Sequence, residues 1–336
     1  MWNRFFFAAG LLGVLSACRS TALSLDSDKD PAAPYLVVLG TAQDGGLPQM
    51  ACRQPCCEAA RRDPARRRLV TSLLLVDPRP APESGSDSGS SSGRRWIFDA
   101  SPDLPLQVER ARGHGGPALD APGRPELFDG VFLTHAHVGH YAGLIQFGRE
   151  VYGSAPVDLI GTPRMTEFLR TNGPWSLLFD GGHANAVTLT VDQPYELADD
   201  LRVTALKVPH RDEFSDTVGF LIEGPTRAAL YLPDIDKWNR WERPLAEVLE
   251  NVDLAFLDGT FHGPEDLPGR DMAEVPHPFI VETIEALADE PAPLLNRVYF
   301  THLNHSNPAA DPASKAAAAV RASGAHVLEE GARFAL

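Results

Sequence analysis

The sequence predicts an α/β fold with stacked layers, and three observations indicate it. From Tyr35 onward, short apolar runs of strand character alternate with longer amphipathic runs. Apolar residues make up 43% of the 336 residues, which is enough for a large core. Eleven strand-like runs are interleaved with six helix-like runs along the chain. Many strands interleaved with helices are typical of layered α/β proteins.

Strands are predicted where aliphatic and β-branched residues run together, and helices where apolar residues recur at helical spacing. In chain order, the predicted strands are Tyr35–Leu39, Leu69–Val76, Arg95–Phe98, Gly130–Leu133, Val157–Ile160, Val187–Val191, Leu201–Val208, Thr217–Ile222, Ala228–Leu232, Leu254–Leu257 and Val298–Thr301. The predicted helices are Glu58–Arg67, Tyr141–Tyr152, Pro163–Thr171, Arg240–Asn251, Pro278–Ala288 and Pro312–Ala322.

The segment 79–93 is rich in Pro, Ser and Gly and lies between two predicted strands. Such composition favours a long disordered loop within a domain over a boundary between domains. The sequence shows no internal repeat and no other linker. We therefore expect one domain over residues 35–336.

The N-terminus has the features of an export signal. Met1–Arg4 is short and positive, and Phe5–Leu15 is apolar but shorter than the roughly 20 residues that a membrane span needs. The ending Leu15-Ser16-Ala17-Cys18 resembles the lipobox of bacterial lipoproteins, in which the cysteine carries the lipid. This resemblance implies a signal peptide over 1–17, lipidation of Cys18, and a flexible tether over 18–34. The protein would then be exported and anchored to a bacterial membrane, facing the periplasm or the cell exterior. A plain signal peptide with an incidental Cys18 is the alternative.

The charge balance limits the class of partner. The chain has 45 acidic and 30 basic side chains, a formal net charge of −15. Binding to nucleic-acid polymers needs a basic surface that displaces counterions, so this class of partner is not expected. A small-molecule substrate is expected instead, because a bound metal ion can attract an anion to an acidic protein. Apart from the lipid anchor, no stretch predicts contact with a membrane.

Three histidines lie close together after a predicted strand. His135, His137 and His140 follow the apolar run that ends at Thr134. His135 and His137 are two residues apart and project to the same side of an extended backbone. Zinc prefers imidazole ligands at about 2 Å, and a strand end that opens into a loop holds them rigidly. The spacing therefore predicts a metal site.

This segment resembles the H-x-H-x-D-H signature of the metallo-β-lactamase-fold superfamily. Further matches occur in the expected order, each at or just after a predicted strand: His210, Asp234 and His302. The resemblance covers residues 35–336 and implies a four-layer αββα sandwich. It also implies that His135, His137, His140, His210, Asp234 and His302 bind one or two zinc ions, and ferrous iron also suits these ligands.

Two branches of the superfamily share further sequence motifs with this chain. The segments around residues 39–49, 233–235, 258–260 and 301–308 are similar to the PqqB family of pyrroloquinoline quinone biosynthesis proteins. Asp258 and His277 resemble the proton-shuttle residues of ribonuclease Z and related phosphodiesterases. This likeness implies that Asp258 orients His277 as a general acid. The alternative is that Asp258 caps a turn and His277 begins a helix.

Gly139 departs from the superfamily pattern, because it stands where the signature has a metal-binding aspartate. Glycine offers no ligand, which puts the second metal site in doubt. Asp212, Asp236 and His305 are candidates to replace the missing ligand. The glycine-rich segment Gly40–Gly46 is interpreted only as a tight turn under the active site.

Cys52, Cys56 and Cys57 lie within six residues. The related families carry a cysteine cluster here that holds a structural zinc together with a distant histidine, although this chain has an altered spacing. A disulfide between Cys52 and one of the other two is the alternative.

The main hypothesis is a metal-dependent hydrolase that attacks a phosphodiester, or another small ester or amide, with hydroxide formed on the metal. One alternative is a PqqB-like iron-dependent oxidation in the biosynthesis of a cofactor or peptide-derived metabolite. The other is a non-catalytic binding protein tethered to the cell surface, with a centre that decayed at Gly139.

Overall fold

The computed structural model describes residues 32–80, 93–115, 125–153, 155–267, 269, 271, 274–290 and 293–336. The predicted signal peptide, Cys18 and most of the 18–34 tether lie outside the described residues, as does most of the predicted 79–93 loop. Among the described residues, no helix has both the length and the apolar character needed to cross a bilayer.

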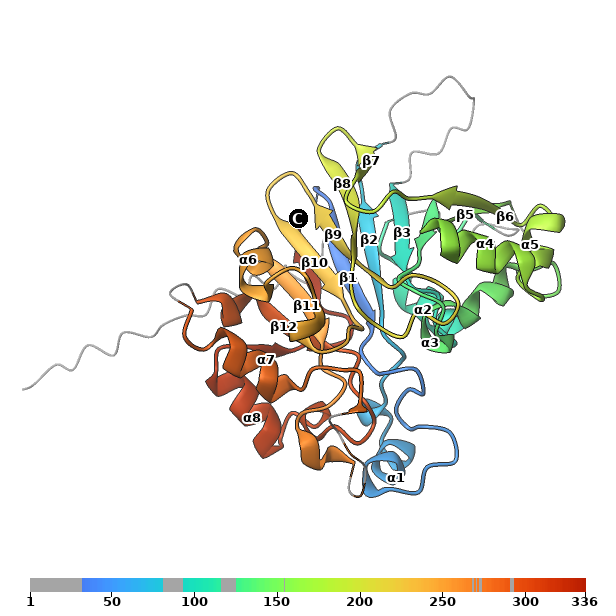
Figure 1. Cartoon of the computed structure of the whole chain (residues 1–336). Coiled ribbons are helices and arrows are strands. Elements are labelled where there is room, and N and C mark those ends of the chain that lie inside the picture. Colours follow the sequence, from blue (N-terminus) through green and yellow to red (C-terminus); the bar gives the residue numbers. More distant parts are fainter. Residues whose placement is uncertain are drawn as a thin grey trace, which may run out of the picture.

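Two mixed β-sheets lie face to face at the centre of the molecule (Figure 1). The first has the order β14-β1-β2-β3-β4-β5-β6. Its strands are β14 (Arg333–Ala335), β1 (Tyr35–Gly40), β2 (Ser72–Asp77), β3 (Arg94–Phe98), β4 (Gly130–Phe132), β5 (Val157–Gly161) and β6 (Ala184–Thr188). Strands β14 to β3 pair antiparallel, and β3 to β6 pair parallel.

The second sheet has the order β13-β12-β11-β10-β9-β8-β7 and repeats this arrangement. Its strands are β7 (Pro194–Ala198), β8 (Leu201–Lys207), β9 (Val218–Glu223), β10 (Ala228–Leu232), β11 (Leu254–Asp258), β12 (Val298–Thr301) and β13 (His326–Val327). Strands β7 to β10 pair antiparallel, and β10 to β13 pair parallel. In both sheets, most of the strands that end at the predicted metal ligands belong to the parallel half.

Helices cover the outer face of each sheet, as Figure 1 shows. On the first sheet lie α2 (Leu104–Ala111), α3 (Val138–Tyr141), α4 (Pro163–Thr171) and α5 (Ser176–Asp180). On the second lie α6 (Leu245–Glu250), α7 (Ile280–Leu287) and α8 (Lys315–Ala322). The short helix α1 (Pro55–Arg62) stands apart at one end of the molecule.

Alternate strand residues point into different layers of the core. In β1, Leu36 and Val38 face the second sheet, whereas Val37 and Leu39 face the helices. The layer between the sheets is built around aromatic rings, and Phe98 stacks on Phe132 with ring centroids 4.9 Å apart. Since both faces of both sheets are buried, most strands consist of nearly continuous apolar runs in the sequence. The predicted four-layer αββα sandwich is confirmed.

Several element boundaries differ from the prediction. The predicted helix 141–152 is wrong: a 3₁₀ helix forms instead over Ala142–Phe147, directly after α3. Gly143 packs tightly here, because a Cβ on it would meet the carbonyl oxygen of Ser101 at 2.0 Å. The predicted helix 240–251 begins only at Leu245, since the residue before Pro244 is disfavoured in helical conformation. The edge strand β7 was not predicted, because it is largely exposed and begins with Pro194.

Candidate metal centre

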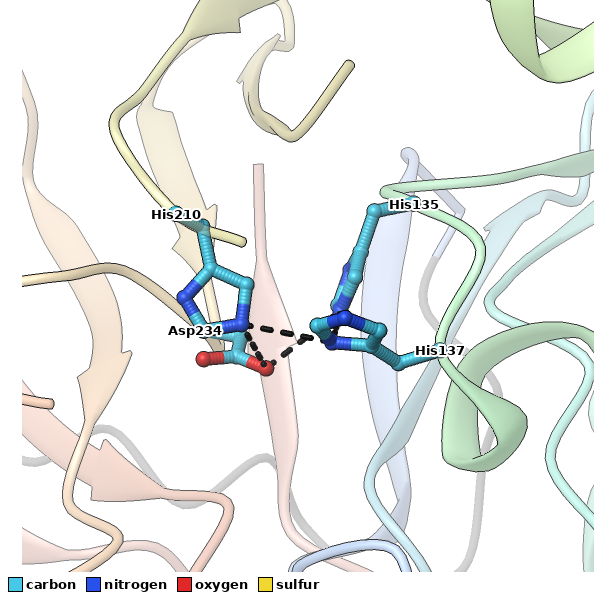
Figure 2. A group of neighbouring side chains, drawn as sticks. All are labelled: His135, His137, His210 and Asp234. Carbon is cyan, nitrogen blue, oxygen red and sulfur yellow. Dashed lines mark hydrogen bonds and ion pairs between the residues drawn. The ribbon is translucent and has the colours of Figure 1, made fainter. Parts of the chain in front are cut away.

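The predicted ligands meet where strands from both sheets end. His135 and His137 follow β4, His210 follows β8, and Asp234 follows β10. Figure 2 shows His135 and His137 approaching from one side and His210 and Asp234 from the other. The fold therefore brings together residues from both halves of the chain.

The four side chains form a compact set of donor atoms. Nδ1 of His137 lies 2.8 Å from Nε2 of His135 and 3.3 Å from Nε2 of His210. Oδ2 of Asp234 lies 3.3 Å from Nε2 of His135 and 3.2 Å from Nε2 of His210. Ligands bonded to zinc at about 2.0–2.2 Å in a tetrahedron lie roughly 3.3–3.6 Å from one another. The residues thus fit a divalent metal ion, which the donor types also favour.

Outer hydrogen bonds fix which ring nitrogen of His135 and of His137 faces this set. Nδ1 of His135 donates to Oγ1 of Thr134 at 3.0 Å, because that hydroxyl itself donates to Asp99. Nε2 of His137 donates to Oε2 of Glu213 at 3.0 Å. The nitrogens that face the centre are left with their lone pairs free, as metal coordination requires.

The electrostatics favour the protonation states that bind metal. Burial holds the pKa of His135 well below its usual range, and burial also lowers the pKa of His137. Burial alone would raise the pKa of Asp234, but His210, His277 and His302 hold it well below its usual range. Neutral imidazoles and an ionised carboxylate are the ligating forms.

A second group lies beside the first and shares Asp234. Nε2 of His140 and Nε2 of His302 lie 3.8 and 4.0 Å from Oδ2 of Asp234. Nδ1 of His140 donates to Asp99 at 2.8 Å, and Nδ1 of His302 donates to Oγ1 of Thr260, also at 2.8 Å. Both Nε2 atoms are buried without a hydrogen-bond partner in the described part of the chain. Buried polar atoms rarely lack a hydrogen-bond partner, so these two nitrogens are suited to bind a metal ion.

One ligand of this group and the carboxylate that holds another adopt backbone conformations that are uncommon outside glycine. His302 has φ +58° and Asp99 has φ +63°. Such conformations cost on the order of 1 kcal/mol and cluster at functional sites. Each of these residues directly follows the last residue of a strand, β12 for His302 and β3 for Asp99.

Asp44 completes the second group and was missed by the sequence analysis. Its Oδ1 lies 3.6 Å from Nε2 of His140 and 3.8 Å from Nε2 of His302. The Gly40–Gly46 segment does form a tight turn, in which the amide of Gly46 donates to the carbonyl of Gln43. No local signal separates this aspartate from an ordinary turn residue.

The three residues considered as replacements for the missing ligand lie elsewhere. The Asp212 carboxylate accepts a hydrogen bond from Thr217, and the Asp236 carboxylate pairs with Arg240. His305 lies among the cysteines. That part of the prediction is wrong, because these side chains are held by partners away from His140 and His302.

Asp258 and His277 are in contact beside both groups. Nδ1 of His277 donates to Oδ2 of Asp258 at 2.8 Å and lies 3.2 Å from Oδ1 of Asp234. Its ring centroid is 5.6 Å from that of His210 and 5.9 Å from that of His302. Burial alone would lower the pKa of His277, but Asp258 and Asp234 raise it to about 10.

The Asp258 carboxylate also accepts hydrogen bonds from the amide and the hydroxyl of Thr260. Asp258 therefore caps the turn after β11 and also holds His277, so these two interpretations are compatible. The alternative that His277 begins a helix is wrong, because α7 begins only at Ile280.

Cys52, Cys56 and Cys57 converge on a distant histidine. Their Sγ atoms lie 3.9, 3.6 and 3.6 Å from Nδ1 of His305. None of these three cysteines forms a disulfide. Three thiols around one imidazole nitrogen are the donor set of a structural zinc site. Burial and the neighbouring thiols raise the pKa of Cys57 to about 12, which disfavours a role as a free nucleophile.

Comparison with known proteins agrees with this geometry. Residues 94–303 match the β-lactamase superfamily domain. The coenzyme PQQ synthesis protein B of Methylobacterium radiotolerans is 30% identical, in an alignment covering 90% of this chain and 99% of that protein. The protein of the same name from Gluconacetobacter diazotrophicus is 28% identical over 81% of this chain and 90% of its own length.

Solved structures share the fold. The Zn²⁺-bound PqqB from Methylobacterium extorquens has a TM-score of 0.71 at 23% identity, covering 90% of this chain and all of that one (100%). A diphosphatase from the PhnP family has a TM-score of 0.59 at 20% identity, over 90% of this chain and 97% of its own.

Proposed function

This chain belongs to the β-lactamase superfamily and is related over most of its length to the coenzyme PQQ synthesis B proteins; on that premise we propose that it is a metal-dependent hydrolase. The proposed substrates are small molecules with a phosphodiester or another ester or amide bond. The observation that carries the proposal is the hydrogen bond of 2.8 Å between His277 and Asp258, placed directly beside the four convergent ligands.

In this proposal His135, His137, His210 and Asp234 hold a zinc or similar divalent ion. A metal ion bound there lowers the pKa of water toward about 7 and so supplies hydroxide at neutral pH. Burial lowers the pKa of His135 and of His137 and so keeps these two imidazoles neutral, and Thr134 and Glu213 orient them. The fixed orientation removes the need to reorganise the ligands during the reaction.

His277 is proposed to protonate the leaving group. Asp258 accepts a hydrogen bond from the Nδ1–H group of His277 and therefore fixes the ring with its other nitrogen available to a substrate. The ring lies between those of His210 and His302, so a substrate bound at the ligand set would meet it. A histidine that only preceded a helix would not need a buried carboxylate partner.

A second candidate function is a biosynthetic step like that of the PQQ synthesis relatives. Identity of 30% over 90% of the chain favours it. In this case an iron(II) ion at the same ligands would work with dioxygen as the oxidant of a cofactor or peptide-derived metabolite.

The test compares both reactions in the purified full chain. We expect hydrolysis of bis(p-nitrophenyl) phosphate, or of a p-nitrophenyl ester, that depends on stoichiometric metal and is lost in His135→Ala. His183→Ala is the matched control, because His183 lies in the turn before β6 and outside the ligand sets. Protein without stoichiometric metal, or full activity in His135→Ala, would refute the proposal. Iron-dependent oxygen uptake without hydrolysis would favour the second candidate.

We also propose that the chain is exported and lipid-anchored through Cys18, with no nucleic-acid partner. The support is the sequence Leu15-Ser16-Ala17-Cys18 and the net charge of −15. Fatty-acid labelling in a bacterial host should mark the wild-type protein and not Cys18→Ser. Equal labelling of both, or of neither, would contradict the anchor.

A further inference from the structure

Gly139 and Asp44 compete for the same space. A Cβ atom built on Gly139 would lie 1.9 Å from Oδ1 of Asp44, 2.7 Å from its Cγ and 2.8 Å from its Cα. Real Cβ atoms essentially never approach another atom this closely, so any side chain at 139 would force both the Asp44 carboxylate and the Asp44 backbone to shift. The carboxylate of Asp44 therefore occupies the volume into which a side chain at position 139 would extend.

The two residues reach this point from different elements. Gly139 lies in α3, between His137 and His140, whereas Asp44 lies in the turn after β1. Backbone hydrogen bonds tie that turn to the end of β12: Gln43 donates to the carbonyl of Leu303, and Leu303 donates to that of Thr41. Since Leu303 follows His302, these bonds place Asp44 beside the His302 ring.

The atoms around this point all lack hydrogen-bond partners within the described ranges. They are Oδ1 of Asp44, Nε2 of His140 and Nε2 of His302, each buried. Oδ1 of Asp44 lies 3.6 Å from Nε2 of His140 and 3.8 Å from Nε2 of His302. Oδ2 of Asp234 lies 3.8 Å from the first nitrogen. These lengths are close to the roughly 3.3–3.6 Å edge of a tetrahedral zinc site.

We propose that Asp44 is the carboxylate ligand of a second divalent metal ion and replaces the aspartate that Gly139 cannot supply. The ion would be held by Asp44, His140 and His302 and would share Asp234 with the first ion. Gly139 is then required by Asp44, because only glycine leaves room for that carboxylate. Gly139→Asp alone is therefore not expected to restore the site, because the new side chain would meet Asp44.

The inference rests on the proposed metal centre but not on hydrolysis, so it is tested by metal binding. Zinc is titrated into the metal-free full chain and counted by elemental analysis after gel filtration. Asp44→Asn keeps the shape of the side chain and removes its charge. We expect this variant to bind one ion fewer than the wild type, or to bind that ion at least tenfold more weakly. Asp289→Asn, at an exposed position after α7, is the matched control and should bind as the wild type does.

The exchanged pair tests the same claim from the opposite side. Gly139→Asp alone should also lose the ion, because its side chain collides with Asp44. In Asp44→Gly combined with Gly139→Asp, the remaining 2.8 Å contact between the Cα of residue 44 and the new Cβ is relieved by a small shift of the turn. This double variant should therefore bind more zinc than either single variant. Circular dichroism checks that each variant is folded, and the double variant carries the test if a single variant does not fold.

The outcomes separate this inference from the proposed function. Unchanged zinc stoichiometry and affinity in Asp44→Asn would overturn the role of Asp44. A folded double variant that binds no more zinc than the singles would overturn it as well. If the wild-type protein binds no zinc at the site that contains His135, so that wild type and His135→Ala bind the same number of ions, the proposed function fails instead.

Discussion

Glu213 accepts a hydrogen bond through Oε2 from Nε2 of His137 at 3.0 Å, and this contact directs Nδ1 of His137 toward His135 and His210. Glu213 lies in the loop after β8, whereas His137 follows β4. The loop that supplies His210 thus also orients a ligand from the other half of the chain. A carboxylate behind a ligating histidine raises the basicity of the ring and fixes its tautomer.

Glu213→Gln should weaken metal binding at the first site. Loss of such a partner typically costs about 10–100-fold in affinity, and we expect the lower end because Glu213 is partly exposed. Competition with a zinc-binding dye measures the change. Glu285→Gln, on the exposed face of α7, is the control. Equal affinity in Glu213→Gln and the control would show that the contact does not support the ligand.

His277→Gln should slow cleavage without removing metal. A general acid typically accelerates a reaction about 10²–10⁴-fold, and its effect is largest where the leaving group is a poor one. The deficit should therefore be large for an alkyl phosphodiester and small for bis(p-nitrophenyl) phosphate, whose leaving group departs without a proton. Steady-state kinetics on both substrates measures the ratio. An equal loss on both substrates would indicate a structural role for His277.

The cysteine cluster should release three reactive thiols when zinc is chelated. Cys52, Cys56 and Cys57 surround Nδ1 of His305 and form no disulfide. Metal-bound thiolates react slowly with Ellman's reagent, so chelation should expose them without any reductant. His305→Ala should weaken zinc binding there and lower the temperature of unfolding. Thiols that appear only after reduction would instead indicate the disulfide considered from the sequence.

Phe98→Ala should destabilise the layer between the sheets. Phe98 is fully buried, stacks on Phe132 at 4.9 Å and packs against Phe220 and Tyr231. Large-to-small changes of buried phenylalanine lower the free energy of unfolding by about 3–5 kcal/mol. Urea titration measures this change. A loss below about 1 kcal/mol would mean that the core closes over the cavity.

The sequence was sufficient for the elements that carry a local signal. Strands such as β10 and β11 are buried on both faces, so their apolar runs are plain in the sequence. The histidines after β4 are recognisable because they lie within one short segment. Helix α4 begins and ends as predicted, because Thr162 caps it and Pro163 occupies its first turn.

The remainder depends on contacts between distant segments. Asp44 joins the site only because the turn after β1 forms backbone hydrogen bonds with Leu303. No periodic pattern in the sequence indicates such a contact. Glu213 is one of many exposed acidic residues until the fold places it behind His137. The geometry of His305 against the cysteines likewise requires α1 and the loop after β12 to meet.

The central claim is that divalent ions lie between the two halves of this chain, and anomalous diffraction at the zinc edge tests it most directly. Crystals of the full chain grown with zinc should show one anomalous peak among His135, His137, His210 and Asp234. A second peak should lie among Asp44, His140 and His302. Zinc peaks confined to the cysteine cluster or the surface, with none at His135, would contradict the account.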